Sequence, residues 1–297
     1  MAIDPVKSLL HLYEDGALTR RDLVQRLTKY TGSAAAALAA MEAVGLAQVN
    51  TAACPAGVQV PESDPSIVSQ MLTISGEGPL YVYQSLPADW ASKPRPAVLV
   101  IHENRGLTDH IKDITRRVAK AGYVGLAVDL LSRQGGTDRF PDPEGATAAY
   151  GRTRPEERRQ DMLAALLTIR DQVYVLGERL GTVGFCAGGA NVWDLALNTD
   201  QLKAAVAYYG PPPAVADVPR LASPMLCLYA ALDRGITGNL GTVIKAMSDA
   251  QKNFEIHIYG NANHAFNNDT GARYDPVAAC DAWAKTLAFF NRYLNAA

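Results

Sequence analysis

Residues 182–189 read Thr-Val-Gly-Phe-Cys-Ala-Gly-Gly, a short apolar run that leads directly into a glycine-rich turn. The apolar residues over 182–185 favour a buried strand. Glycines two positions before and two positions after Cys186 fit a turn that is too tight for a β-carbon at either place. The stretch therefore predicts a strand, a sharp turn that presents the Cys186 thiol, and a helix that begins at Ala187.

Strands and helices alternate on both sides of this turn. The candidate strands are Gln70–Ile74, Leu80–Gln84, Ala97–Ile101, Val124–Leu131, Thr182–Phe185, Ala204–Tyr209, Met225–Ala230 and Glu255–Tyr259. The candidate helices are Ile111–Ala121, Pro155–Asp171, Ala187–Leu197, Gly238–Ala250 and Pro276–Leu294. The first two strands are close enough to form an antiparallel hairpin, whereas parallel neighbours need crossover helices. The order predicts an α/β domain over 67–297, in which helices cover both faces of a mostly parallel eight-stranded sheet.

A small helical extension is expected over 1–50, followed by a proline-containing linker over 51–66. Apolar spacing and capping residues favour three short helices, and the residues that carry this pattern are Val6, Leu9, Leu10, Tyr13, Thr19, Leu23, Val24, Leu27 and Ser33. Basic and acidic side chains are equal in number over 1–50, which disfavours a DNA-binding helix-turn-helix. We expect a packing arm or the contact of a homodimer.

Charge and hydropathy limit the partners and the location. A formal net charge of −2 gives no electrostatic reason to bind nucleic acid or an anionic membrane. No apolar run reaches the length of a transmembrane helix. We therefore predict a cytoplasmic protein. The run Thr19-Arg20-Arg21-Asp22-Leu23-Val24 ahead of an alanine-rich stretch leaves export through a degenerate twin-arginine-like signal as the alternative.

The four cysteines, Cys54, Cys186, Cys227 and Cys280, are widely spaced. Their spacing matches neither a zinc motif nor a small disulfide scaffold. Cys227 lies in the apolar run 225–230 and is expected to pack as a small hydrophobic residue. The sequence assigns no chemistry to Cys54 or Cys280, and it predicts no metal site.

Three chemically active side chains follow strands of the predicted sheet, in the order Cys186, Asp233 and His264. The carboxyl ends of parallel strands meet at one edge, and the order nucleophile, acid, base is typical of enzymes with this kind of turn. His264 would accept the thiol proton, and Asp233 would orient the imidazole and stabilise its charged form. The backbone N–H groups of Ala187 and Asn104 would bind the oxyanion of an acyl transfer. These residues form the predicted catalytic site.

The same motifs resemble those of the dienelactone hydrolase (carboxymethylenebutenolidase) family, within the α/β-hydrolase superfamily. The resemblance covers about 67–295, and its motifs are Glu103 in His102-Glu103-Asn104-Arg105-Gly106-Leu107, Cys186 in Gly184-Phe185-Cys186-Ala187-Gly188-Gly189, Asp233, and His264 in His264-Ala265-Phe266. It implies the α/β-hydrolase fold and hydrolysis of a small ester or lactone through an acyl-enzyme, without a metal or organic cofactor. It also implies that Glu103 holds the resting thiol neutral until substrate displaces the carboxylate.

One position departs from the family pattern. The best-known members carry an arginine four residues after the catalytic histidine, where this chain has Asn268, so the resemblance does not carry dienelactone over as the natural substrate. A second substrate-binding arginine of the family falls in a region where this chain offers Arg133, Arg139, Arg152 and Arg154. The candidate substrate-binding residues are Arg105, Arg133, Tyr150 and Phe266.

Three alternatives stand beside this prediction. A thioesterase or short-peptide hydrolase would use the same triad on a different substrate. A non-catalytic ligand-binding protein on a hydrolase fold belongs to another class, and the intact set of Cys, Asp, His and Glu disfavours it. A DNA-binding regulator with a ligand-sensing domain is disfavoured by the balanced charge of residues 1–50. The leading prediction is a Cys-His-Asp hydrolase that cleaves a small ester or lactone.

Overall fold

The computed structural model describes the part of the chain that consists of Val6, Leu9, residues 20–33 and residues 54–295. Its contacts divide the chain into two compact units, Met1–Ala52 and Ala53–Ala297. Among the described residues, no helix combines the length and the apolar character needed to cross a lipid bilayer.

In the first unit, α2 (Arg20–Thr31) coincides with the second predicted helix. Leu23 and Leu27, on its expected inner face, are fully buried. Val6 and Leu9 are helical, and the other residues of the predicted extension lie outside the described ones, including Leu10, Tyr13, the Thr19 cap and the helix expected beyond Ser33. The predicted division into an extension, a linker and a hydrolase domain therefore stays a proposal.

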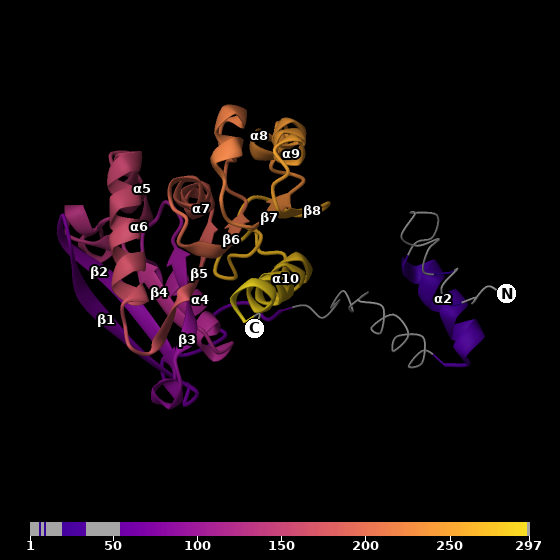
Figure 1. Cartoon of the computed structure of the whole chain (residues 1–297), viewed down its shortest axis with the longest axis horizontal. Coiled ribbons are helices and arrows are strands. Elements are labelled where there is room, and N and C mark those ends of the chain that lie inside the picture. Colours follow the sequence, from indigo (N-terminus) through magenta and orange to yellow (C-terminus); the bar gives the residue numbers. More distant parts are fainter. Residues whose placement is uncertain (1–5, 7–8, 10–19, 34–53, 296–297) are drawn as a thin grey trace. The chain divides into compact units, whose positions relative to one another are not determined.

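The second unit contains an eight-stranded sheet, which Figure 1 shows as a twisted layer between helices. Its strands are β1 (Ile67–Gly76), β2 (Gly78–Pro87), β3 (Arg95–Ile101), β4 (Val124–Val128), β5 (Val175–Phe185), β6 (Leu202–Tyr208), β7 (Met225–Ala230) and β8 (Phe254–Tyr259). The spatial order is β1-β2-β4-β3-β5-β6-β7-β8. β2 pairs antiparallel with β1 and β4, and the other neighbours are parallel. The predicted hairpin and the mostly parallel sheet are confirmed.

Helices cover both faces of this sheet. Those with ten or more residues are α4 (Asp109–Lys120), α6 (Pro155–Arg170), α7 (Ala187–Asn198), α9 (Leu240–Asp249) and α10 (Pro276–Leu294). Shorter ones are α5 (Pro143–Gly151), α8 (Arg234–Thr237), η1 (Trp90–Ser92), η2 (Ser132–Gln134), η3 (Thr137–Arg139) and η4 (Val215–Arg220). Apolar residues of α4 and α10 pack on one face, and those of α5, α6, α7 and α9 pack on the other. The fold is the predicted α/β class.

Successive residues of the central strands alternate between these two faces. In β3, Val98 and Val100 face α4 and α10, whereas Leu99 and Ile101 face α6 and α7, and all four are fully buried. A strand with helices on both sides has no solvent-facing side, so its sequence is continuously apolar. This burial fixes the ends of β3, β5, β7 and β8, from which the predicted site residues project.

The strand β4 ends three residues earlier than the sequence predicts. β4 stops at Val128 rather than at Leu131, because the Asp129 carboxylate accepts hydrogen bonds from the backbone N–H groups of Leu131 (3.0 Å) and Thr137 (2.7 Å). An aspartate that bonds its own downstream backbone favours a turn over continued pairing. The turn directs the following residues toward the carboxyl edge of the sheet.

The two cysteines without an assigned chemistry form a disulfide. Cys54 pairs with Cys280 of α10, across a sequence separation of 226 residues. The predicted linker, over its described residues 54–66, is thus covalently attached to the α/β unit. Cys227 is fully buried and free, as predicted for a small hydrophobic residue.

Candidate active site

The Cys186 turn adopts a backbone conformation that few residues tolerate. Cys186 lies between β5 and α7 with φ 56° and ψ −117°, in the region that normally favours glycine. A β-carbon on Gly184 would lie 2.2 Å from the Gly188 carbonyl oxygen, and one on Gly188 would lie 2.3 Å from that of Ile101. The two glycines therefore permit a turn that exposes the thiol at the edge of the sheet.

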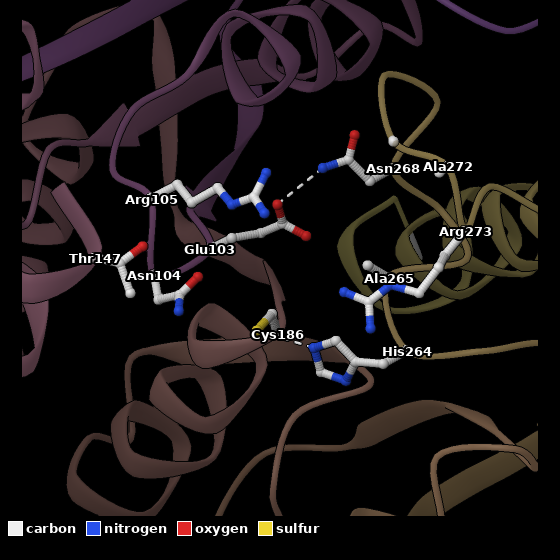
Figure 2. A pocket seen from close by; sticks show the side chains of 11 residues that line it. Glu103, Asn104, Arg105, Thr147, Cys186, His264, Ala265, Asn268, Ala272 and Arg273 are labelled. Carbon is white, nitrogen blue, oxygen red and sulfur yellow. Dashed lines mark hydrogen bonds between the residues drawn. The ribbon is translucent and has the colours of Figure 1, made fainter. Parts of the chain in front are cut away.

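The three predicted triad residues come together at this edge. His264 Nε2 lies 3.0 Å from Cys186 Sγ, and His264 Nδ1 lies 2.6 Å from Asp233 Oδ2. The His264 and Asp233 side chains are 23% and 16% exposed, so a substrate can reach the ring while the carboxylate stays largely shielded. Figure 2 shows Cys186 and His264 facing each other across the floor of a pocket. This geometry permits proton transfer from the thiol to the imidazole.

The resting thiol is neutral at physiological pH. Burial first, and then the negative charge of Glu103, raise the pKa of Cys186 to about 11. Backbone N–H groups of Ala187 and Asn104 bond to the sulfur and act in the opposite direction. Two backbone N–H donors therefore lie next to the sulfur.

Glu103 is buried beside the thiol, with 6% of its surface exposed. Its Oε2 atom accepts a hydrogen bond of 2.9 Å from Asn268 Nδ2, and its Oε1 atom has no partner within the part of the chain that the structure describes. Asn268 is oriented in turn, because its Oδ1 atom accepts from the Thr270 hydroxyl at 2.7 Å. The carboxylate therefore keeps one free acceptor close to the Cys186 thiol.

The loop that carries Glu103 is fixed from behind by His102. His102 Nδ1 lies 2.5 Å from the Glu103 carbonyl oxygen, and Nε2 accepts from the Leu130 N–H at 2.9 Å. Burial lowers the pKa of His102, so the ring is neutral, with its proton on Nδ1. His102 is a structural anchor that the sequence motif contained but did not identify as one.

A cavity of about 460 Å³ opens above the thiol. Its walls come from the loop after β3, from α5 and from the loop between β8 and α10, and its residues are Glu103, Asn104, Arg105, Thr147, Cys186, His264, Ala265, Asn268, Gly271, Ala272 and Arg273. Arg105 and Arg273 extend from opposite sides of this cavity in Figure 2. Neither guanidinium has an ion-pair partner among the described residues, so the cavity is lined by two unpaired arginines and by the carboxylate of Glu103.

Of the four residues proposed to bind substrate, the structure brings only Arg105 to this cavity. Arg133 lies in another hollow, where it forms an ion pair with Asp161. Tyr150 is buried and its hydroxyl accepts from Asn191, while Phe266 is fully buried among other aromatic rings. The sequence analysis did not select Arg273, although it follows the predicted histidine in the same loop.

Residues 81–294 match the family model for the dienelactone hydrolase family. The chain belongs to the dienelactone hydrolase family. Its curated relatives include a protein of Escherichia coli (strain K12) named "Putative carboxymethylenebutenolidase", which is 33% identical over 80% of this chain and 90% of the relative. A protein of Methylorubrum extorquens with the same name is 31% identical over 73% of this chain and 78% of the relative.

Solved structures of the dienelactone hydrolase family share this fold. A structure from Klebsiella pneumoniae subsp. pneumoniae MGH 78578, named "Putative Dienelactone Hydrolase", has a TM-score of 0.71 at 32% identity and covers 76% of this chain and 99% of that chain. A dienelactone hydrolase-like promiscuous phosphotriesterase from metagenomic libraries has a TM-score of 0.67 at 25% identity, with coverage of 77% and 99%. The protein is therefore a dienelactone hydrolase-like hydrolase that acts on a small molecule.

Proposed function

We propose that this protein cleaves a small carboxylic ester or lactone by covalent catalysis, with Cys186 as nucleophile, His264 as base and acid, and Asp233 as the residue that orients His264. The observation that carries the proposal is the continuous chain of contacts from Cys186 Sγ to His264 Nε2 (3.0 Å) and from His264 Nδ1 to Asp233 Oδ2 (2.6 Å). This arrangement matches the nucleophile, base and orienting group that acyl transfer requires. Family membership supports the same conclusion.

In the proposed reaction, the thiol proton moves to His264 as the sulfur attacks the acyl carbon. The oxyanion that forms accepts hydrogen bonds from the N–H groups of Ala187 and Asn104, and His264 then protonates the leaving alkoxide. In a lactone, that alkoxide remains attached to the acyl group. Water, deprotonated by His264, attacks the thioester, and the sulfur leaves and regains its proton. The products are a carboxylic acid and an alcohol.

Glu103 is proposed to control the state of the thiol. Its charge helps to raise the pKa of Cys186 to about 11, after burial, so the resting enzyme holds a poorly reactive thiol. A substrate that enters the cavity competes for the space and the free Oε1 acceptor of Glu103. When the carboxylate moves or is protonated, the charge that opposes thiolate formation is removed.

We further propose that the substrate carries a negative charge. Arg105 and Arg273 both line the cavity and are exposed, and neither has an ion-pair partner in the described residues. Guanidinium groups bind carboxylates with two parallel hydrogen bonds. Asn268 also lines the cavity, although its amide is already bonded to Glu103. This proposal does not include Arg133, Tyr150 or Phe266, because none of them lines the cavity.

A thioesterase or a short-peptide hydrolase would use the same residues, so substrate preference separates these alternatives. A panel of matched esters, lactones, thioesters and amides, each in an anionic and a neutral form, should show the highest kcat/KM for an anionic ester or lactone. Mass spectrometry of the quenched enzyme should find an acyl adduct on the peptide that contains Cys186. If no such adduct forms and turnover is unchanged by Cys186→Ala, covalent catalysis by Cys186 is contradicted.

The location of the protein and the homodimer contact through residues 1–50 are also proposals. The sequence favours the cytoplasm, but the Cys54–Cys280 disulfide favours the exported alternative, because disulfides persist in oxidising compartments and are rare in the cytosol. Cell fractionation followed by alkylation of free thiols distinguishes the two locations and reports the state of the disulfide in each. A cytosolic pool with both cysteines alkylated supports the cytoplasmic prediction.

A further inference from the structure

The loop between β8 and α10 carries His264 at its start and the cavity residues Asn268 and Arg273 further along. We call residues 264–275 the histidine loop. Its two ends are tied together, because the Asp275 N–H donates to the Phe266 carbonyl at 3.0 Å. The conformation of this one loop therefore places the proposed base, the partner of Glu103 and one of the two cavity arginines.

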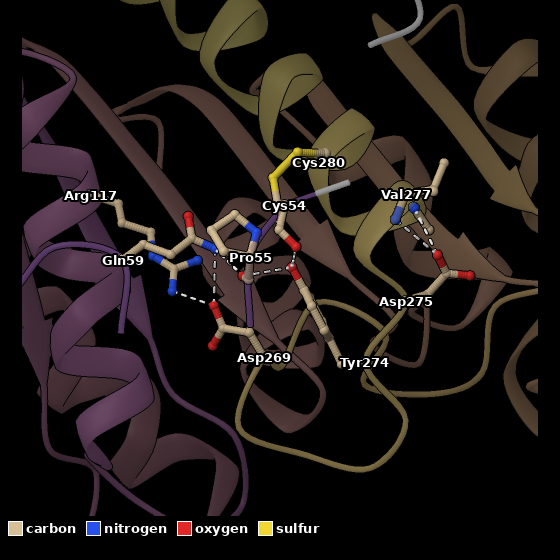
Figure 3. The surroundings of a disulfide bond; sticks show 10 residues. Cys54, Pro55, Gln59, Arg117, Asp269, Tyr274, Asp275, Val277 and Cys280 are labelled. Atoms are coloured by element: carbon tan, nitrogen blue, oxygen red, sulfur yellow. Dashed lines mark hydrogen bonds and ion pairs between the residues drawn. A yellow bond between two sulfur atoms is a disulfide. The ribbon is translucent and has the colours of Figure 1, made fainter. Parts of the chain in front are cut away.

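Residues 54–60 lie against the outer side of the histidine loop, as Figure 3 shows, and we call them the clamp. The Tyr274 hydroxyl donates to the carbonyl oxygens of Cys54 (2.9 Å) and Pro55 (3.1 Å). The Gly57 N–H donates to the Asp269 carbonyl at 3.1 Å. The clamp thus contacts the histidine loop near its middle, at Asp269, and near its end, at Tyr274. Each of these hydrogen bonds involves a backbone atom of the clamp.

Asp269 is the point at which the clamp, the loop and α4 meet. Its carboxylate accepts a hydrogen bond from the Gln59 side chain at 3.2 Å, contacts His110 Nδ1 at 3.0 Å and forms an ion pair with Arg117. The residue is 6% exposed, so these partners replace water around the charge. A shift of Asp269 would leave its buried carboxylate without these partners, which makes its present position strongly preferred.

The clamp is also fixed to α4 independently of the loop. The backbone N–H groups of Gln59 and Val60 donate to the two carboxylate oxygens of Asp113, at 3.0 and 2.9 Å, and Arg117 pairs with the same carboxylate. At its other end, the clamp is closed onto α10 by the Cys54–Cys280 disulfide. Both ends are therefore attached to the α/β unit, and the histidine loop is held between them.

We propose that the clamp, closed by the Cys54–Cys280 disulfide, positions the histidine loop for catalysis, and that Asp269 is the positioning residue through which it acts. Asp269 is next to Asn268, whose amide donates to Glu103 Oε2 at 2.9 Å. The clamp therefore influences the group that sets the reactivity of Cys186, although it does not touch the cavity. This inference rests on the proposed function of the cavity. It assigns a role to residues 54–60, which do not line the cavity.

The decisive variant is Cys54→Ser/Cys280→Ser, which opens the clamp at α10 and leaves every residue of the histidine loop unchanged. Amide hydrogen exchange over 266–275 should accelerate by roughly tenfold or more, while exchange in β3 and β5 stays unchanged. KM for an anionic ester should rise by about three- to tenfold, because Arg273 lies on the loop, while KM for the neutral isostere should change little. Gln59→Ala, which removes one clamp contact, should give a smaller change in the same direction.

Reduction of the wild-type protein should reproduce the double variant. A dithiol such as dithiothreitol donates two electrons and two protons to the disulfide, which yields thiols at Cys54 and Cys280, and the dithiol is oxidised to a cyclic disulfide. Cys186 is already a free thiol, so the reductant leaves the proposed nucleophile unchanged. Activity measured before and after reduction therefore reports on the clamp alone.

Cys227→Ala is the matched control. Cys227 is a fully buried thiol of β7 whose side chain packs on the sheet face opposite to Phe266 and α10, so its loss destabilises the fold without touching the clamp. If Cys227→Ala changes loop exchange and substrate selectivity as much as the double variant does, general destabilisation explains the result and the clamp is refuted. Unchanged exchange over 266–275 in the double variant also refutes it. Faster loop exchange in a protein that hydrolyses no ester would refute the proposed function and leave the clamp standing.

Discussion

Asn268 Nδ2 donates a hydrogen bond of 2.9 Å to Glu103 Oε2, so the carboxylate beside the Cys186 thiol is held by a neutral amide. The best-known family members have an arginine at this position, whose positive charge would offset the charge of the carboxylate. Here position 268 supplies no positive charge, and the charge of Glu103 is the second cause, after burial, of the raised pKa of the Cys186 thiol. The resting reactivity of Cys186 should therefore depend directly on Glu103.

Replacing Glu103 with Gln should make the resting thiol more reactive. Loss of the negative charge lowers the pKa of Cys186 from about 11, and at pH 7 each unit of decrease raises the thiolate fraction about tenfold. Alkylation by iodoacetamide, followed from pH 6 to pH 10, should show a faster reaction at neutral pH and an earlier rise. Ester turnover should fall. Glu77→Gln, which changes an exposed carboxylate paired with Arg133, is the control. Equal alkylation rates in Glu103→Gln and wild type would show that Glu103 has no influence on the thiol.

Cys186→Ala should abolish covalent catalysis with little effect on the fold. Removal of a nucleophile commonly costs three or more orders of magnitude in kcat, so we expect a decrease of at least about 10³-fold. The melting temperature should change little, because alanine adds no atoms to the tight turn. Labelling of the native protein should modify Cys186 alone among the four cysteines, since Cys54 and Cys280 are paired and Cys227 is buried. Near-normal turnover in the variant would assign the chemistry to another group.

Arg273→Gln should reduce selectivity for anionic substrates. An exposed guanidinium that pairs with a carboxylate in a partly desolvated cavity contributes about 1–2 kcal/mol, which corresponds to a change of roughly five- to thirtyfold in kcat/KM for an anionic ester. The neutral isostere should react at its original rate. Arg220→Gln removes an exposed arginine that lies outside this cavity and should affect neither substrate. A parallel loss with both esters would indicate a structural role for Arg273.

Deletion of residues 1–52 tests the predicted homodimer contact. If the extension joins two copies, the shortened protein should elute from size exclusion at half the mass of the full chain and keep its kcat for small esters. Equal oligomeric states in the two proteins would contradict the predicted contact. Salt-sensitive binding of the full chain to duplex DNA at submicromolar concentration would instead support the DNA-binding alternative.

The sequence predicted the parts of the fold and site that depend on local patterns. The central strands are continuously apolar, and the candidate catalytic residues lie at or shortly after strand ends, so Cys186, Asp233 and His264 could be placed at one edge without coordinates. The helix α5 was missed because its residues, rich in alanine and glycine, have no clear apolar stripe. Its Thr147 nevertheless lines the cavity.

Other features depend on loop conformation or on distant pairing, which the sequence does not encode locally. Phe266 was expected in the pocket, but the chain turns at Ala265, with φ 65°, and Phe266 is buried in the core while His264 faces the thiol. Arg273 reaches the cavity only because the histidine loop folds back on itself. The pairing of Cys54 with Cys280 spans 226 residues, and spacing alone gives no indication of it.

The pairing of Cys54 with Cys280 also sets an order of events during synthesis. A ribosome releases the amino-terminal cysteine long before its partner, which lies in α10, so nearly the whole α/β unit must be translated before the bond can form. A nascent chain can already contain the Cys186 turn while the clamp is still open. If the clamp acts as proposed, full activity is acquired only after Cys280 has emerged from the ribosome and has paired with Cys54.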